Sequence, residues 1–592
     1  MKKIYILFIL ALLPLTASAF SGTDVVDGIW YVIVTKGRAA EVTCPNGAKY
    51  SGDIVIPSTI EYDGVVCNVT TIRKEAFTES KNLNSVVIGD RITSIPEGAF
   101  DGCSSLKSVT IPQSVTTIED YAFSGCSSLT DIVIPDAVTK ISYRAFYGCS
   151  SLVSVKVPDG VTSISAHAFY GCSNLSSISL PSDLTYIGVN AFHGCSSLLS
   201  VVIPSGVTEI VRYTFQGCSG LQSVTIPNSV TTIGEEAFSG CISLTSLVMG
   251  GGITSFEKNA FLNCKKVKDI KVVVADLSDF SNNKVIGLIK NNIGGYVKLI
   301  DEQGSEIVDY VIPDGVTSIG EFAFYHCNGL TSITIPASVT SIGRFAFWEC
   351  EKMTAVYISD ITAWCAARID NNPILQARHL YLNGEEVKDL VIPDGVTSIG
   401  KWAFEYCEQL TSVSIPSSVK SIGEMAFYNC TSLTSINIPN SVTSIGESAF
   451  QKCNSLTTVS VGNKLGGLGY SAFGDCRELT DFYCKTKKPV FASIVFYNSY
   501  VEYATLYVPL GSVQQYRDND NWGKFGHIVA LGDVNCDDKV NVADIVAVVN
   551  YIKYQSIPAA YDIKRVDMDG NGIIDDSDVS SLVDLIMDWA QE

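Results

Sequence analysis

Charged residues and histidines are scarce in this sequence. Asp, Glu, Lys and Arg together make up 17% of the 592 residues, and only five residues are His. The acids outnumber the bases by 61 to 41, which gives a formal net charge of −20. Nucleic acid and anionic membranes repel a chain this acidic, so we predict no nucleic-acid partner. Five scattered histidines also argue against a His-rich metal enzyme.

Familiar catalytic motifs are missing as well. The chain has no Gly-x-Ser-x-Gly, no His-Glu-x-x-His and no phosphate-binding loop. His167 and His193 stand beside repeated Phe residues, and His326 lies near another, which favours surface or packing roles. We therefore predict no catalytic residues and no enzymatic activity. A pair of carboxylates brought together by folding remains an open alternative for glycoside hydrolysis.

The N-terminus has the pattern of a secretory signal peptide. Met1-Lys2-Lys3 is basic, an apolar stretch runs to Leu15, and Ala17-Ser18-Ala19 forms a small-x-small cleavage site. We predict a signal peptide over residues 1–19 and a secreted or cell-surface protein. The apolar stretch is shorter than the ~20 residues that a membrane span needs. No later stretch is long enough either, so we predict no transmembrane segment after cleavage.

A repeat of 23 residues dominates the remaining chain. An Ala-Phe pair or a close variant recurs in three groups, and within each group successive Phe residues lie 23 positions apart. The repeated residues are Phe77, Phe100, Phe123, Phe146, Phe169, Phe192, Phe215, Phe238, Phe261, then Phe324, Phe347, then Phe404, Phe427, Phe450 and Phe473. These fifteen repeats are separated by two longer gaps.

Each repeat contains a short alternating run that ends at a proline. In Leu106 to Pro112, the alternation predicts a β-strand with Val109 and Ile111 facing inward. The segment from Val115 to Phe123 is interpreted as a turn or a short helix. One such unit cannot bury its apolar side alone, whereas stacked units can. The pattern therefore predicts an α/β repeat solenoid with a parallel sheet along one face.

The repeated string Ile-Pro-x-x-Val-x-x-Ile-x-x-x-Ala-Phe-x-x-Cys resembles the BspA-like group of leucine-rich-repeat proteins over residues 54–484. The resemblance implies attachment to host matrix proteins or to other bacteria. Insertions at about 265–310 and 351–390 interrupt the repeats. The second insertion predicts a short helix after Ile361 and a hairpin after Leu380. Such insertions either carry binding or cover a sheet edge, and the sequence favours neither.

Segments at both ends of the repeats are predicted to cap them. Residues 20–53 read as a β-rich N-terminal cap. Residues 485–531 read as a C-terminal cap, with a last strand from Leu506 and a short helix ending near Tyr516. Open ends would expose apolar core and unpaired backbone, which is why solenoids need caps.

The cysteines follow the same period. The chain has 19, and fourteen of them stand three residues after a repeat Phe. They are Cys103, Cys126, Cys149, Cys172, Cys195, Cys218, Cys241, Cys264, Cys327, Cys350, Cys407, Cys430, Cys453 and Cys476. One per repeat at a constant phase predicts a ladder of small buried side chains, so we favour free thiols over disulfides.

The outward positions of the predicted strands hold mainly Ser and Thr, as at Ser108 and Thr110. Tyr357 and Tyr483 are the rare aromatic residues on this face. Such a face suits strand stacking. It also suits repeated weak contacts with an extended protein or glycan surface, and no single binding hot spot stands out.

Residues 532–592 are rich in Asp and contain two loops with the spacing of calcium ligands. The predicted ligands of the first loop are Asp533, Asn535, Asp537, Lys539, Asn541 and Asp544. Those of the second are Asp567, Asp569, Asn571, Ile573, Asp575 and Asp578. In each loop the seventh residue, Lys539 or Ile573, supplies a backbone carbonyl. An apolar helix is predicted after each loop, so we expect a small α-helical domain with two Ca²⁺ sites.

The two loop-helix units resemble a type I dockerin. An EF-hand sensor would have Glu at the last place of each loop, where this chain has Asp. The resemblance implies calcium-dependent folding and a cohesin-like partner. Well-known dockerins have a Ser-Thr type pair at the tenth and eleventh places, where this chain has Val542-Ala543 and Asp576-Ser577. This departure leaves the identity of the partner open, and a purely structural role is the alternative.

Two functions follow from these features. The first is an exported, non-catalytic binding or adhesion protein, whose solenoid recognises a host matrix or bacterial surface protein or a glycan. The second is a structural or targeting subunit of a polysaccharide-degrading complex, attached through its dockerin-like domain.

Overall fold

The chain folds into two compact units. The computed structural model describes residues 21–34, 38–44, 47–274, 285–293, 296–492, 494–537, 539–567 and 573–590. The first unit takes the chain as far as Lys268 and includes Asn292–Gly294. The second unit comprises Asp269–Asn291 and the chain from Gly295 onward.

A five-stranded sheet opens the first unit, in the order β1-β2-β3-β6-β5. Its strands are β1 (Ser21–Val26), β2 (Ile29–Val34), β3 (Ala39–Thr43), β5 (Thr59–Tyr62) and β6 (Val65–Ile72). The pairing of β3 with β6 is parallel and the others are antiparallel. The sheet extends past residue 53, the expected end of the cap. In the chain, β4 (Ser51–Ile56) lies between β3 and β5, but it belongs to another sheet and pairs in parallel with β7 (Asn82–Ile88) of the first repeat.

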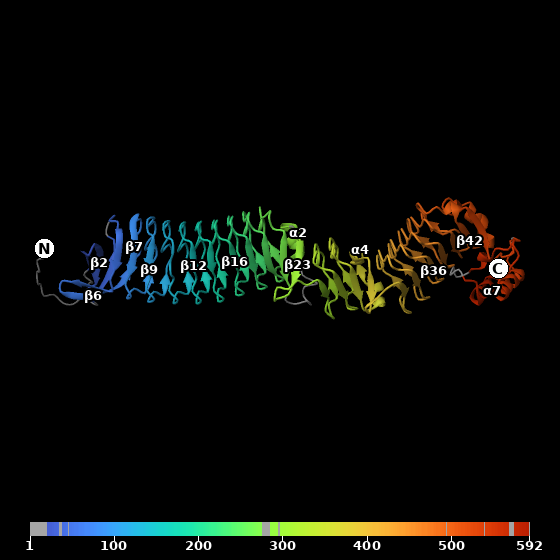
Figure 1. Ribbon diagram of the computed structural model, residues 1–592, viewed down its shortest axis with the longest axis horizontal. Helices are drawn as coiled ribbons and strands as arrows, with labels where there is room; N and C mark the ends of the chain where they lie inside the picture. Colours follow the sequence, from blue (N-terminus) through green and yellow to red (C-terminus); the bar gives the residue numbers. More distant parts are fainter. Residues whose placement is uncertain are drawn as a thin grey trace, which may run out of the picture. The chain divides into compact units, whose positions relative to one another are not determined.

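Two rows of strands form the coils of the first unit (Figure 1). The long row contains β4, β7, β9 (Ser108–Thr110), β12 (Ser154–Lys156), β14 (Ser177–Ser179), β16 (Ser200–Val202), β18 (Ser223–Ile226) and β20 (Ser246–Gly250). The short row contains β8 (Ser94–Ile95), β10 (Thr117–Ile118), β11 (Lys140–Ile141), β13 (Ser163–Ile164), β15 (Tyr186–Ile187), β17 (Glu209–Ile210), β19 (Thr232–Ile233) and β21 (Ser255–Phe256). All strand pairings within these rows are parallel. The long row confirms the predicted parallel sheet along one face, whereas the short row is a second set of parallel strands that the sequence did not indicate.

The repeated Phe residues form a stacked ladder inside the coils. From Phe77 to Phe261, neighbouring ring centroids lie 4.9 to 5.6 Å apart. Val109 and Ile111 are buried, as predicted. In the regular repeats, the segment that follows each long-row strand consists of turns and the two-residue strand of the short row. A turn or a short helix was expected there. We call the outward side of the long row the sheet face.

The ladder cysteines are buried, free thiols, which confirms the prediction. The Sγ of Cys149 donates a hydrogen bond to the carbonyl oxygen of Phe123 in the preceding coil, at 3.2 Å. The Sγ of Cys172 does the same to the Phe146 carbonyl, also at 3.2 Å. Burial raises the pKa of Cys149 to about 12, so the thiol stays protonated and unreactive at neutral pH. These cysteines therefore join adjacent coils without any covalent bond.

Each coil also contains a residue in the left-handed backbone region two positions before its Phe. Tyr121, Arg144 and His167 have φ of 57°, 53° and 57°. This conformation costs a non-glycine residue about 1 kcal/mol or more. Hydrogen bonds to the next coil offset the cost, as from Tyr121 N–H to the Tyr143 carbonyl at 2.9 Å.

The second unit repeats this plan. Its long row contains β22 (Asp269–Val273), β23 (Tyr296–Ile300), β24 (Asp309–Val311), β26 (Ser332–Ile335), β28 (Ala355–Ile358), β30 (Leu380–Leu382), β32 (Asp389–Val391), β34 (Ser412–Ser414), β36 (Ser435–Ile438), β38 (Thr458–Val461), β40 (Asp481–Cys484), β42 (Thr505–Pro509) and β43 (His527–Leu531). Its short row contains β25 (Ser318–Ile319), β27 (Ser341–Ile342), β29 (Arg368–Ile369), β33 (Ser398–Ile399), β35 (Ser421–Ile422), β37 (Ser444–Ile445), β39 (Gly467–Leu468) and β41 (Phe491–Ala492).

Both insertions contain a helix. The first contains α2 (Val285–Asn292). The second contains α3 (Ile361–Ala366) and α4 (Ile374–Ala377). It also contains the predicted hairpin, in which β30 pairs antiparallel with β31 (Glu385–Glu386). Asp360 caps α3 by accepting a hydrogen bond from the backbone N–H of Ala363.

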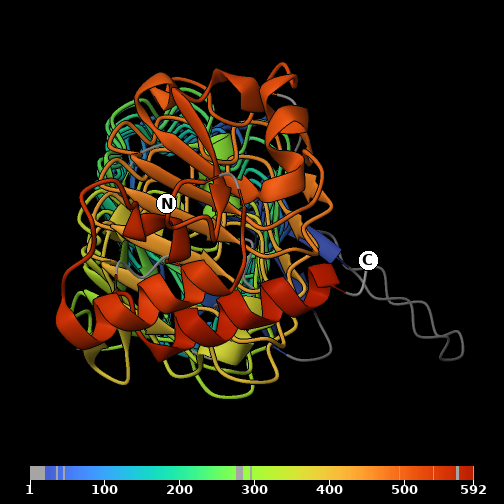
Figure 2. The same cartoon turned by 90° about the vertical axis from the view of Figure 1, so that its right-hand side faces the viewer.

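The C-terminal end differs from expectation in one respect. The strand expected to be last is β42, and α5 (Val513–Arg517) follows it as predicted, but β43 adds a further parallel strand beyond it. Three short 3₁₀ helices, η1 (Val501–Tyr503), η2 (Leu510–Ser512) and η3 (Trp522–Lys524), fill the connections. The remaining elements are α6 (Val542–Tyr554), η4 (Ile563–Val566) and α7 (Asp576–Ala590), and α6 and α7 lie side by side (Figure 2).

Candidate calcium-binding site

The first predicted calcium loop follows the last strand without a linker. β43 ends at Leu531, Gly532 turns the chain with a φ of 86°, and Asp533 begins the loop. The Asp533 side chain is fully buried. Its Oδ1 accepts a hydrogen bond from the backbone N–H of Asp537 at 2.9 Å. The loop is therefore wrapped around the carboxylate of its first residue.

The carboxylate of Asp544 closes the same loop. Its Oδ1 accepts from the backbone N–H groups of Val534 and Asn535, at 2.9 and 3.2 Å. Its Oδ2 accepts from the N–H of Asn541 at 2.9 Å, while Asn541 caps the first turn of α6. This reciprocal pair is a capping box, so the twelfth loop residue also fixes the start of the helix.

We call the two loop-helix units of residues 532–592 the module. Arg565 connects its two halves, and no sequence pattern singles this residue out. Its Nη1 lies 2.9 Å from Asp533 Oδ2, and its Nε lies 3.3 Å from Asp562 Oδ2. Its carbonyl accepts from the N–H of Gly532 at 2.7 Å. Arg565 stands two residues before the second loop and 32 residues after Asp533, so no local spacing indicated the pair.

The second loop shows the same placement of buried acids at its ends. Asp567 and Asp578 are buried, and Asp578 Oδ2 accepts from the N–H of Asp575 at 3.1 Å. Hydrogen bonds from Ser577 lower the pKa of Asp575. Two predicted ligands of this loop, Asp569 and Asn571, lie outside the described residues.

The residues of the two loops offer oxygen donors of the kind that bind calcium. The part of the chain that the structure describes contains no cluster of three or more His, Cys, Asp or Glu side chains placed to hold a metal ion. The predicted ligand sets also use asparagine and backbone oxygens, the donors that Ca²⁺ prefers. Asp533, Asp544, Asp567 and Asp578 are all buried, and they supply carboxylate oxygens at the first and last places of the two loops, where Ca²⁺ ligands stand. The residues therefore suit a divalent cation.

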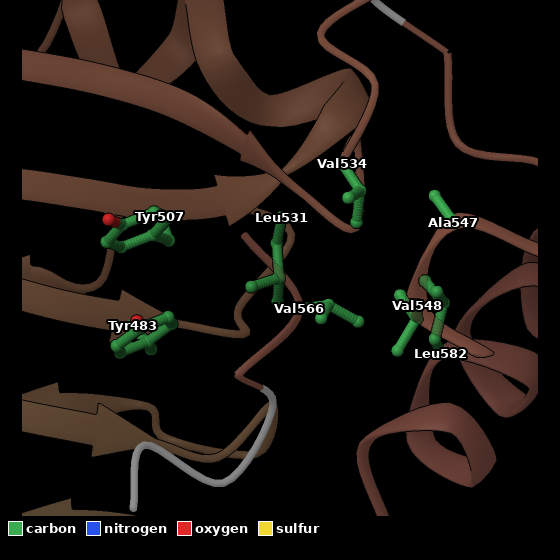
Figure 3. Close-up of a cluster of buried hydrophobic side chains, with 8 residues drawn as sticks. All are labelled: Tyr483, Tyr507, Leu531, Val534, Ala547, Val548, Val566 and Leu582. Carbon is green, nitrogen blue, oxygen red and sulfur yellow. The ribbon is translucent and has the colours of Figure 1, made fainter. Parts of the chain in front are cut away.

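The module packs against the end of the solenoid within the second unit. One hydrophobic cluster contains sheet residues and module residues together (Figure 3). Its members are Tyr483, Tyr507, Leu531, Val534, Ala547, Val548, Val566 and Leu582. The sequence predicts an exposed aromatic side chain at Tyr483 on the sheet face. This prediction is wrong, because the module covers the position and leaves Tyr483 only 1% exposed.

One side of each helix faces away from this cluster. Val542, Val546 and Val549 of α6 are exposed, as are Val583 and Met587 of α7. In α6 these valines are spaced by four and three residues and so share one face. An exposed apolar row on a helix is a common docking surface for a partner.

Among the described residues of the first unit, aromatic and basic side chains gather around Arg144. Arg144 lies over the rings of Tyr121, Tyr143 and Tyr147, at 5.6, 5.2 and 5.0 Å from their centroids. His167 packs edge-on against Tyr143, and burial lowers its pKa. The predicted packing role of this histidine fits the structure.

A parallel solenoid with a loop-helix module at its end defines a repeat protein that carries a docking domain. The chain belongs to the BspA type leucine-rich repeat family. Residues 70–199, 186–283, 303–366 and 378–502 match the repeat region of that family. Residues 531–586 match the dockerin type I domain, so the predicted family resemblances and fold class are confirmed. Domains of this type generally bind calcium and dock to cohesins.

Solved structures from bacteria are similar to this chain. A leucine-rich repeat protein from Bacteroides ovatus is 26% identical, with 78% of this chain and 94% of that chain covered and a TM-score of 0.36. A leucine-rich cell surface protein from Faecalibacterium prausnitzii is 27% identical, with 77% and 96% covered and a TM-score of 0.25. Among curated proteins, no match was found. Within the described residues, no helix is long and apolar enough to cross a membrane.

Proposed function

We propose that this chain is an exported, non-catalytic binding protein. Its repeat surface recognises a host matrix protein, a bacterial surface protein or a glycan, and its C-terminal module docks on a cohesin-like partner when loaded with calcium. Proteins with these two domains are typically extracellular or at the cell surface, and neither domain is generally catalytic. Cleavage of residues 1–19 is part of the proposal, and N-terminal sequencing of the secreted protein tests it.

The exposed row Val542, Val546 and Val549 supports the docking half of the proposal. The module already uses its other side to pack on the solenoid, yet this apolar row stays uncovered within the described residues. Val542 stands at the tenth loop position, where other dockerins have a Ser or Thr. An aliphatic residue there favours a partner with an apolar rather than a hydroxyl-binding pocket.

Calcium is assigned to the twelve loop residues predicted from the sequence. Asp533 and Asp544 supply buried carboxylates in the first loop, and Asp567 and Asp578 do so in the second. One ion in each loop offsets the cost of burying these charges. Asp544 also caps α6, so metal binding and the orientation of the exposed helix face depend on the same side chain.

The sheet face supports the recognition half of the proposal. Exposed and half-buried residues follow one another at equivalent strand positions, with Val202 66% exposed beside the half-buried Thr225 of the next strand. Such a surface makes many weak contacts instead of one strong contact, which suits an extended ligand.

A matched pair of variants tests the docking half of the proposal. Val546→Asp places a charge on the helix row, where Val546 is 52% exposed, and Val202→Asp makes the same change on the sheet face. We expect Val546→Asp to abolish capture of the full chain by purified cohesin domains in calcium, while Val202→Asp leaves capture unchanged. Equal capture of both variants, or capture in the presence of chelator, contradicts the docking proposal.

The second candidate function is a structural or targeting subunit of a polysaccharide-degrading complex. The dockerin match favours it, because such a domain implies a cohesin-bearing partner. Binding of the full chain to purified matrix proteins without glycan hydrolysis supports adhesion. Co-purification with cohesin-bearing glycan hydrolases supports the second candidate, and glycan turnover by the purified chain alone contradicts both.

A further inference from the structure

The exposure of the sheet face changes abruptly near the C-terminal end. Val391 is 66% exposed, and Asn437 at the corresponding position of β36 is also exposed. The corresponding residues of the next three strands, Ser460, Tyr483 and Tyr507, are 0%, 1% and 2% exposed. The same register position therefore passes from solvent to interior between β36 and β38.

The residues that cover this part of the sheet face come from the end of β43 and from the module. Leu531, Val534 and Val566 lie between the two tyrosine rings and the helices in Figure 3. The rings of Tyr483 and Tyr507 are stacked, with centroids 4.4 Å apart. An aromatic pair on a sheet face is buried favourably only if an apolar surface covers it.

A polar contact holds the edge of this cover. Lys564 Nζ lies 3.2 Å from Asp481 Oδ2, and the Tyr507 hydroxyl donates to Asp481 Oδ1 at 3.0 Å. Asp481 is buried, so the module and the sheet share a charged hydrogen-bonded contact besides the apolar one.

The covering residues stand directly beside the predicted calcium ligands. Val534 follows Asp533, the first residue of the first loop, and Val566 precedes Asp567, the first residue of the second loop. We propose that the sheet face of β38, β40 and β42 is a docking surface for the chain's own C-terminal module, and that calcium holds the module on it. Loss of the metal uncovers Ser460, Tyr483 and Tyr507.

The charge of the loops explains why the cover requires metal. The first and last carboxylates of both loops are buried, and Arg565 pairs with Asp533. Without a divalent cation, repulsion and desolvation favour opening of the loops. Because Val534 and Val566 are attached to the loop ends, opening displaces the apolar residues that cover the tyrosines. The inference rests on the calcium binding proposed above and is independent of any cohesin partner.

Hydrogen exchange in the full chain tests this proposal, together with calorimetric titration by Ca²⁺. We expect exchange in β40 and β42 to accelerate at least tenfold when chelator replaces calcium, with no change in β36. Tyr483→Ser gives β40 the same residue that β38 has at the corresponding position, Ser460. It should abolish the calcium-dependent protection of β42 while calcium still binds. Tyr357→Ser makes the same substitution on β28, away from the module, and should have no such effect.

The outcomes separate this proposal from the docking proposal. Calcium binding without a calcium-dependent difference in β40 and β42 overturns the inference, and so does an absence of calcium binding. Protection that persists in Tyr483→Ser also overturns it. If protection behaves as expected but cohesin capture fails, the calcium-dependent packing of the module on the sheet face is supported. Only the docking on a cohesin is then refuted.

Discussion

Replacing Phe169 by Ala removes one ring from the middle of the Phe ladder in the first unit. The ring is fully buried, and its centroid lies 5.3 Å from that of Phe146 and 5.4 Å from that of Phe192. Truncating a buried Phe to Ala typically costs about 3–5 kcal/mol. The Phe169 ring has a neighbour on each side, so we expect a loss in the upper part of that range.

The place where Phe169→Ala lowers stability is as informative as the free energy that is lost. In a stacked array each coil contacts only its neighbours, so the destabilisation should be local. We expect hydrogen exchange to accelerate by about 1,000- to 4,000-fold in β12, β14 and β16, which corresponds to about 4–5 kcal/mol at 1.4 kcal/mol per tenfold change. Exchange in the strands near the N-terminal sheet should change much less.

Tyr186→Ala is the matched control, because it also removes an aromatic ring from this region but from a side chain that is 47% exposed. We expect its effect on exchange to be within threefold of the unchanged chain. Equal effects of the two variants, or an effect of Phe169→Ala spread evenly over the whole first unit, would refute the reasoning that the ladder is the local core of each coil.

Three further predictions concern single side chains. At pH 8 the folded chain should react with a thiol reagent at the exposed Cys536 but not at Cys149, whose pKa burial raises to about 12, and mass spectrometry locates the label. Burial raises the pKa of Glu405 to about 7 from an ordinary 4.5, so the folded state holds a proton that the unfolded state has released, and stability falls as pH rises between these values. Glu405→Gln should remove this fall, raising the unfolding midpoint at pH 8 and leaving it unchanged at pH 4; equal shifts at both pH values contradict the assignment. Arg565→Met removes the ion pair of the buried Asp533 carboxylate with Arg565, at a cost of about 3–5 kcal/mol in chelator and less in saturating calcium, measured as exchange in α6.

The sequence was most informative where one pattern recurs. The 23-residue spacing of Phe and Cys specified the parallel coils and the free thiols, because each position meets its equivalent in the next coil. The same spacing accounts for the stacked Phe rings that the structure shows. Local patterns also predicted α3 and the hairpin of β30 and β31, since capping and turn residues act over a few positions.

Contacts between distant segments were not predictable in this way. Tyr483 looked like an exposed sheet residue because its strand has the same alternation as the others. Only the module, which begins some 50 residues later, buries it. Arg565 carries no motif, and its pairing with Asp533 depends on how the two loops come together. The strand β43 was missed because no repeat Phe or Cys marks it.

The bonds between adjacent coils have a consequence for how such a chain can change length. In the first unit, the Cys149 thiol binds the carbonyl of Phe123, and the next coil repeats this contact from Cys172 to Phe146. Removing one whole 23-residue coil would join two coils that offer each other the same partners, whereas removing a few residues would break the register. Gene duplication or deletion in whole repeats therefore adjusts the reach of the protein in steps of ~4.8 Å while the chemistry at both ends stays the same.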